Sequence, residues 1–118
     1  MRAPEAPLPV TGFGPGFFRV GEDLVRGPML LVQGAGPAQW SGLGSGLAGH
    51  DALLALAGRV DVLLVGTGAQ MAFLPPDLQA RLDAAMIGAE AMATPVALRS
   101  YNMLLGDGRR IALAALPV

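Results

Sequence analysis

The second half of the sequence alternates apolar runs of strand length with helical patterns, and this alternation constrains the fold more than any other feature. Residues 60–65 form a near-continuous apolar run, which is typical of a strand covered on both faces. Similar runs at 89–93 and 111–116 predict two further strands, and the segments 75–87 and 94–105 carry helical signals. This order is that of a layered α/β protein in which 60–65 and 89–93 are parallel and close together.

Prolines and glycines indicate where the two helices begin and end. Residues 75–77 (Pro-Pro-Asp) open the first helix, and Gly88 is expected at its C′ position. Thr94 is expected to cap the second helix, with Pro95 in its first helical position. The apolar face of the first helix is predicted to contain Leu74, Leu78, Leu82, Ala85 and Met86. The buried face of the second is predicted to contain Ala97, Leu98, Tyr101, Leu104 and Leu105.

The first half of the sequence is rich in turn residues and predicts shorter elements. Residues 1–15 carry four prolines and are expected to form an irregular lead-in. Residues 17–25 read as a short hairpin, because apolar pairs flank a Gly-Glu-Asp turn, and 28–32 is a further strand. A long glycine-rich loop is expected over 33–49, followed by a short helix over 50–57 that Gly58 closes.

Charge and cysteine content exclude several classes of function. The formal net charge is −1, all eight cations are arginine, and Arg109-Arg110 is the only adjacent basic pair, so we expect no nucleic-acid partner. The chain has no cysteine and one histidine, His50, which excludes a thiol nucleophile and predicts no metal site and no catalytic residues. The apolar runs are too short to span a membrane, and residues 1–9 lack the apolar core of a signal peptide. We therefore expect a cytoplasmic protein with no membrane span and no cofactor.

One group of residues is a candidate site for a small anion. Gly66, Thr67 and Gly68 follow the strand at 60–65, and Thr94 follows the strand at 89–93. Parallel strands bring their carboxyl ends to one edge of a sheet, which is where open α/β sheets bind ligands. The free N–H groups of the helix beginning at Thr94 would attract an anion, and Arg99 could add charge. The alternative is that the glycine turn only allows strand and helix to pack closely, because the glycine pattern is incomplete and no lysine is present.

Two further residues are candidate contacts with a protein partner. Trp40 lies in the glycine-rich loop and could be an anchor for a partner or a lid over the core. Asn102 lies off the buried face of the 94–105 helix and could bind a partner, form a cap or simply lie at the surface. With few charges to oppose self-contact, a homo-oligomer is also possible.

The order and spacing of several features resemble a known family over about residues 12–117. They are Gly16-Phe17 before the hairpin, Gly27 before an apolar strand, Trp40 before a short helix, residues 62–68, Thr94 with the helix that follows it, and Gly108-Arg109 before the last strand. The chain resembles a small domain family of unknown biochemical function in bacteria and archaea, whose eukaryotic relatives include a mitochondrial assembly factor of respiratory complex I.

The resemblance implies a three-layer α/β fold over a single domain, 1–118, with a central mixed sheet flanked by helices and an additional N-terminal β hairpin. It implies no known reaction. Members often carry Cys and Thr where this chain has Leu98 and Ser100, so any role of that thiol is absent here. The function expected is that of a non-catalytic, protein-binding or assembly-type factor. The alternative is a domain that binds a small anion or metabolite, with or without a reaction.

Overall fold

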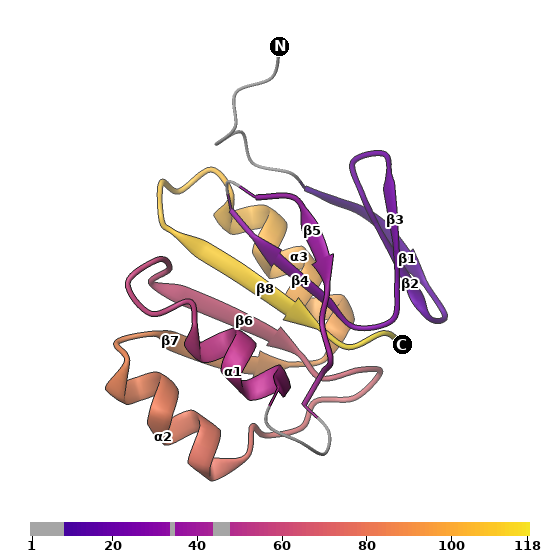
Figure 1. The fold of residues 1–118 in the computed structure, drawn as a ribbon. Helices are drawn as coiled ribbons and strands as arrows, with labels where there is room; N and C mark the ends of the chain where they lie inside the picture. The colour runs from indigo at the N-terminus through magenta and orange to yellow at the C-terminus, as the bar shows by residue number, and fades with distance from the viewer. Residues whose placement is uncertain (1–8, 34, 44–47) are drawn as a thin grey trace.

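The computed structural model describes residues 9–33, 35–43 and 48–118, which form two β-sheets and three helices (Figure 1). A five-stranded sheet has the order β5-β4-β8-β6-β7, and a three-stranded sheet has the order β1-β2-β3. The strands are β1 (Val10–Gly14), β2 (Phe17–Val20), β3 (Asp23–Arg26), β4 (Met29–Val32), β5 (Pro37–Gln39), β6 (Val62–Gly66), β7 (Gly88–Met92) and β8 (Ile111–Ala115). The helices are α1 (Ala48–Leu54), α2 (Pro76–Ala84) and α3 (Thr94–Leu104).

The five-stranded sheet is mixed, as predicted. Strands β8, β6 and β7 are parallel, whereas β4 is antiparallel to both β5 and β8. The connection from β6 through α2 to β7 runs toward one edge, and the connection from β7 through α3 to β8 runs back across β6. Two crossovers of the same hand that run in opposite directions put their helices on opposite faces of the sheet. The predicted three-layer α/β arrangement follows from this.

Alternation along the central strands divides the core into two halves. In β8, Ile111, Leu113 and Ala115 face α3, whereas Ala112 and Ala114 face α1 and α2. Every residue of β8 is buried, because the strand has neighbours on both sides and layers on both faces. This burial explains why the sequence of β8 is a continuous apolar run.

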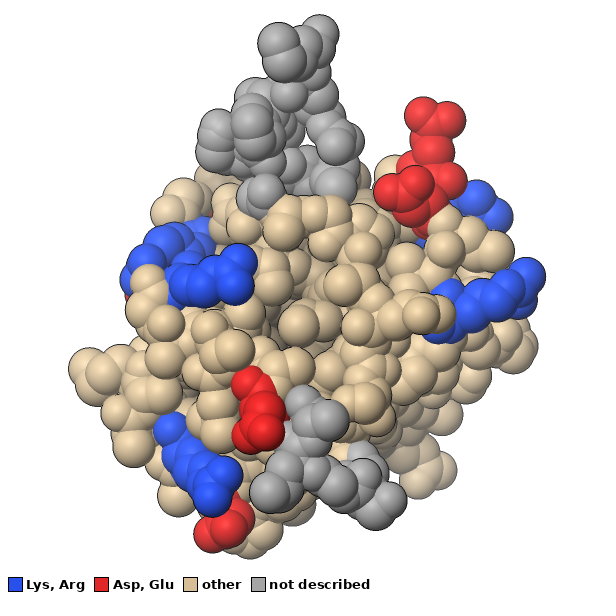
Figure 2. Space-filling view, viewed as in Figure 1, with Lys and Arg blue, Asp and Glu red and all other residues tan. Residues whose placement is uncertain are grey.

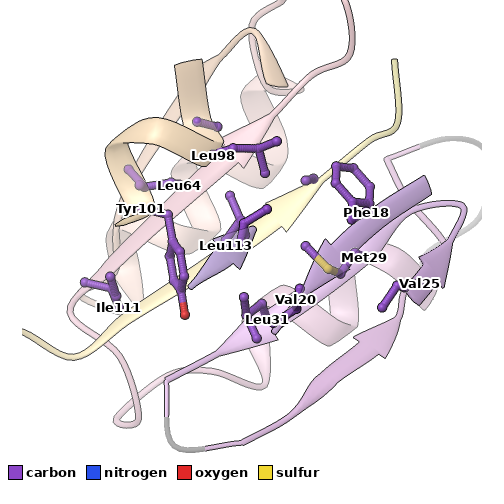
Figure 3. Close-up of a cluster of buried hydrophobic side chains, with 13 residues drawn as sticks. Phe18, Val20, Val25, Met29, Leu31, Leu64, Leu98, Tyr101, Ile111 and Leu113 are labelled. Atoms are coloured by element: carbon purple, nitrogen blue, oxygen red, sulfur yellow. The ribbon is translucent and has the colours of Figure 1, made fainter. Parts of the chain in front are cut away.

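The N-terminal sheet packs beside α3 on the same face of the large sheet. Phe18 of β2 and Val25 of β3 belong to one buried cluster with Met29 of β4 (Figure 3). The predicted hairpin over 17–25 is confirmed as β2 and β3. The prediction of an irregular lead-in over 1–15 is wrong for Val10–Gly14, which form β1 and pair with β2. Residues 1–8 lie outside the described residues.

Two other boundaries differ from the sequence prediction. The predicted loop over 33–49 contains a short strand, β5, that pairs with β4, while Gly34 and 44–47 lie outside the described residues. The backbone of Pro37–Gln39 is held by hydrogen bonds to a strand distant in sequence, which a local pattern does not report. The predicted helix over 50–57 begins earlier, and its regular part ends at Leu54.

The end of α2 also differs from the prediction. Ile87 N donates to Leu82 O at 3.0 Å and Met86 N donates to Asp83 O at 3.0 Å, which together form a Schellman motif. The left-handed C′ residue is therefore Met86, with φ of 63°, and Gly88 is instead the first residue of β7. Met86 consequently points outward and is 84% exposed, whereas Leu78 and Leu82 are buried as predicted.

Candidate functional site

The carboxyl ends of β6, β7 and β8 meet at one edge of the sheet, as predicted for the first two. Thr67 N donates to Met92 O at 2.9 Å, which continues the pairing of β6 with β7. Leu116 N donates to Gly66 O at 2.8 Å, which continues the pairing with β8. The candidate residues of the anion site therefore lie where three strand ends are already linked by backbone hydrogen bonds.

The Thr94 hydroxyl joins the same three segments from the start of α3. It donates to Leu116 O at 2.7 Å and accepts from Gly68 N at 2.8 Å, and Thr94 N donates to Gly68 O at 2.8 Å. Thr94 is fully buried. The predicted N-cap role is wrong: Ala93 occupies the cap position, no side chain caps the helix, and Pro95 is its second residue. The hydroxyl instead serves tertiary contacts, because its hydrogen bonds go to a carbonyl and an amide group of two other segments.

Gly66 is required by the close approach of β6 to α3. A Cβ atom at this position would lie 2.8 Å from Thr94 Oγ1 and 3.0 Å from Thr94 Cα. The second of these contacts is with backbone, which cannot rotate away. Gly68 meets a different requirement, because its φ of +106° is unfavourable for residues with a side chain. Both glycines support the packing alternative of the sequence prediction.

The Thr67 hydroxyl holds the loop that leads to α2. It accepts from Ala72 N at 2.9 Å and lies 2.9 Å from Gln70 O and 3.1 Å from Met92 O, to which it can donate. Both threonine hydroxyls at this edge are therefore occupied by internal hydrogen bonds. Four of the five predicted anion-site residues lie together, but Arg99 lines a separate shallow cavity between α3 and β1. Anion binding at this edge stays a prediction, and the hydrogen bonds favour the structural alternative.

Trp40 and Asn102, the predicted partner contacts, both form hydrogen bonds within the protein. Trp40 is 6% exposed, lies in the core beneath α1, and donates from Nε1 to Gly49 O at 3.0 Å. This position favours the alternative of a lid over the core, and a contact of Trp40 with a partner stays a prediction. Asn102 is exposed, but its Nδ2 donates to Val10 O at 2.8 Å and its Oδ1 accepts from Val10 N at 2.9 Å. Its amide therefore fastens β1 to α3.

Ionisable side chains that could bind a metal ion are dispersed in the described part of the chain. No three His, Asp or Glu side chains gather there in a way that could hold a metal ion. Tyr101 is fully buried, its hydroxyl has no hydrogen-bond partner among these residues, and burial raises its pKa to about 12. The phenol is held neutral in an apolar cluster, to which its ring contributes packing.

A feature that the sequence prediction missed lies at the open edge of β7. Gly88 N donates to Asp61 O at 2.9 Å, and Met92 O accepts from Thr67 N, so both residues direct their backbone groups toward β6. Backbone groups alternate along a strand, so those of Ala89 and Ala91 face away from the sheet. No described residue pairs with these outward N–H and C=O groups.

An apolar groove runs beside this edge, between β7 and α3. It has a volume of about 250 Å³ and is lined by Leu64, Glu90, Met92, Ser100, Met103 and Leu104. Met103 is 77% exposed. In the sequence, this groove could have been recognised only from Met103, an apolar residue that lies off the apolar face of the helix.

Among the described residues, no helix is both long and apolar enough to cross a membrane.

Comparison with known proteins agrees with this fold. The chain is 48% identical over 111 residues to an uncharacterised protein of Rhodobacter capsulatus, covering 94% of this chain and 86% of the relative. A crystal structure of a Bartonella henselae protein described as an outer membrane protein has a TM-score of 0.84 at 27% identity, covering 97% of this chain and 98% of that one. A crystal structure of a Bordetella parapertussis protein has a TM-score of 0.82 at 33% identity, covering 96% and 98%. Residues 10–116 match the family model described as protein of unknown function DUF498/DUF598, which confirms the resemblance seen in the sequence, and the chain belongs to this family.

Proposed function

We propose that the protein acts through protein contacts, by accepting an extended segment of a partner as an added strand along β7. The observation that carries the proposal is the open edge of β7 beside the apolar groove. Ala89 and Ala91 present outward backbone N–H and C=O groups at the spacing that an incoming strand requires. Small side chains at these two positions leave the edge accessible to another backbone.

The groove supplies the side-chain selectivity that backbone pairing lacks. Met92 and the exposed Met103 offer flexible apolar contacts, which adapt to differently shaped side chains. Glu90 is the one ionisable side chain in the lining of the groove. The partner segment we infer is therefore extended, with apolar side chains on the face toward α3 and an Arg or Lys placed opposite Glu90. The family that the sequence resembles includes an assembly factor of respiratory complex I, and this resemblance also supports a role in protein contacts.

A photocrosslinking experiment in cells tests the proposal. A photoreactive residue replaces Met103, and the control replaces Met86, which is also highly exposed but lies at the end of α2. We expect position 103 to crosslink to one partner protein and position 86 not to do so. The segment of the partner is then identified by mass spectrometry. Crosslinks only to a second copy of this chain, or equal yields at both positions, would overturn the proposal.

Binding of the identified partner segment provides the quantitative test. Met103→Glu places a charge in the apolar groove, and Ala91→Pro removes an outward N–H group and adds a ring at the edge. Each change is expected to weaken binding at least tenfold, whereas Met86→Glu should leave it unchanged. Circular dichroism of each variant separates loss of binding from loss of fold. A folded Met103→Glu variant that binds as well as the wild type would contradict the proposed surface.

A further inference from the structure

A further cavity lies at the opposite end of the sheet from Thr67 and Thr94, and arginine dominates its lining. It is lined by Gln33, Arg59, Val60, Gly108, Arg109, Arg110 and Ile111, and its volume is about 250 Å³. Three of the eight arginines in the chain thus surround one hollow. In Figure 2, basic side chains gather on the side of the molecule where the α1–β6 and α3–β8 connections lie in Figure 1.

Backbone geometry brings these arginines together from distant parts of the sequence. Gly58 and Gly108 both have positive φ, of 78° and 76°, and each turns the chain directly before an arginine. Asp61 N then donates to Arg110 O at 2.8 Å, which ties the two connections side by side. The positions of Arg59 and Arg109 are therefore set by two glycine turns and by the parallel pairing of β6 with β8.

Arg110 forms a fixed wall of the cavity and is already neutralised. Its Nη2 lies 2.8 Å from Asp61 Oδ1, its Nε donates to Asp61 Oδ2 at 3.2 Å, and its Nη1 donates to Gly58 O at 2.8 Å. The hydrogen bond from Arg110 holds the pKa of the Asp61 carboxyl below its usual range. Because Asp61 is committed to Arg110, it does not offset the charge of the other two arginines.

Arg59 and Arg109 remain available to a ligand. Neither forms an ion pair with another described residue. Asp107 precedes Arg109 by two positions but is not part of the lining. The lining carries three positive charges, and Asp61, which pairs with Arg110, contributes one negative charge. The net charge around the cavity is therefore +2.

Gln33 adds a neutral donor to the lining of the cavity. Its Oε1 accepts from Ile111 N at 3.3 Å, and its own backbone N donates to Ile111 O at 3.1 Å. These bonds orient the side-chain amide, whose Nε2 donates to no described residue. Val60 and Ile111 are buried and provide an apolar floor. Two unpaired guanidinium groups and one amide N–H₂ thus line the hollow together with two buried apolar side chains.

We infer that this cavity binds the phosphate group of a small phosphate monoester. Guanidinium forks match the oxygens of phosphate in pairs, and two free arginines balance the charge of about −2 that the group carries at neutral pH. The apolar floor excludes water from one side of the group and strengthens these contacts. The rest of the ligand extends out of the hollow. This site is independent of the strand-addition surface at β7.

Titration of the ¹⁵N-labelled protein with methyl phosphate, followed by NMR, tests the inference. The backbone amides of Gln33, Gly108 and Ile111 are expected to shift with saturation, and those of Thr67 and Gly68 are expected to stay in place. Sodium chloride at the same ionic strength is the control for screening. Affinity should fall as pH is lowered from about 7 to 5, because the phosphate loses its second charge near pH 6.

Paired double variants decide whether the two free arginines carry the binding. Arg59→Gln with Arg109→Gln is expected to weaken binding at least tenfold. Arg19→Gln with Arg26→Gln removes the same charge from the N-terminal sheet and should leave the affinity unchanged. Equal weakening in the two double variants, shifts reproduced by chloride, or shifts centred on Thr67 would each overturn the inference. Arg110 is left intact throughout, because its bonds to Asp61 and Gly58 O are structural.

Discussion

Asn102 and Val10 are 92 residues apart in sequence, and the side-chain amide of Asn102 pairs with both backbone polar groups of Val10. The bonds, at 2.8 and 2.9 Å, copy the pairing of one strand with another, so α3 in effect provides a strand edge for β1. Replacing Asn102 by Ala leaves the N–H and C=O of Val10 without these partners.

Asn102→Ala is therefore expected to lower the free energy of unfolding by about 1–3 kcal/mol. Hydrogen exchange should accelerate at the amides of β1 before it does in β8, because the lost contact is local to the first strand. Gln39→Ala, which removes a weak bond of 3.4 Å to Arg26 O, is the control and should change little. Equal loss of protection in β1 and β8 would contradict this assignment.

The close contact between Gly66 and Thr94 predicts that adding one methyl group at position 66 destabilises the fold. Gly66→Ala would place Cβ against the backbone of Thr94 and is expected to lower the free energy of unfolding by about 2–3 kcal/mol. Gly106→Ala is the matched control, because its Cβ meets no atom within 4 Å and its φ is not positive. Chemical denaturation of both variants measures the difference, and similar midpoints would refute the packing role.

The left-handed conformation of Met86 predicts a substitution that stabilises the protein. A non-glycine residue in this region costs about 1–2 kcal/mol, and the exposed side chain of Met86 contributes little packing in return. Met86→Gly is expected to raise the free energy of unfolding by about 0.5–1 kcal/mol, after the extra flexibility of glycine in the unfolded chain is deducted. Met86→Val should have the opposite effect, because branching at Cβ worsens the strain. The melting temperatures of the two variants are the measurement. A shift of both in the same direction would contradict this explanation.

Because the buried hydroxyl of Tyr101 has no hydrogen-bond partner among the described residues, we expect that its removal does not destabilise the protein. A buried donor without a partner costs about 1–3 kcal/mol, so Tyr101→Phe is expected to leave stability unchanged or raise it by about 1 kcal/mol. A loss of more than this would indicate a hydrogen bond to Tyr101 in solution.

The raised pKa of Tyr101 also predicts how stability depends on alkaline pH. The folded chain keeps the phenol protonated up to a pH of about 12, whereas the unfolded chain releases this proton near pH 10. Between these values the unfolded state binds fewer protons, so stability should fall by up to about 1.4 kcal/mol per pH unit. Because the chain has one tyrosine, no lysine and no cysteine, tyrosinate absorbance reports this titration directly. Tyr101→Phe should abolish the pH dependence in this range.

How much the sequence could predict depended on whether the deciding contacts were local. The parallel strands and the buried face of α2 were predictable, because apolar residues such as Leu78 and Leu82 repeat at the period of the element itself. Strand β1 was not, because Thr11, Gly12 and Gly14 favour a loop until β2 and Asn102 supply partners. Four of the five candidate anion residues were correctly placed at one edge, whereas Arg99 lines a separate cavity.

What the sequence could not predict at that edge was the use of its polar groups. The Thr94 hydroxyl bonds to Leu116 O, 22 residues away, and to Gly68 N, 26 residues away. The arginine cavity was missed for a related reason. Arg59 and Arg109 are 50 positions apart, and only the pairing of β6 with β8 brings their connections together.

The central position of β8 also has a consequence for the order of events during synthesis. Strands β4 and β6 leave the ribosome well before residues 111–115, yet neither pairs with the other in the finished sheet. Until β8 emerges, the nascent chain holds two incomplete halves, each with an unpaired strand edge and exposed apolar side chains. A nascent chain stalled before residue 111 should therefore be sensitive to protease and bound by chaperones. One carrying residues up to 116 and clear of the ribosome should resist both.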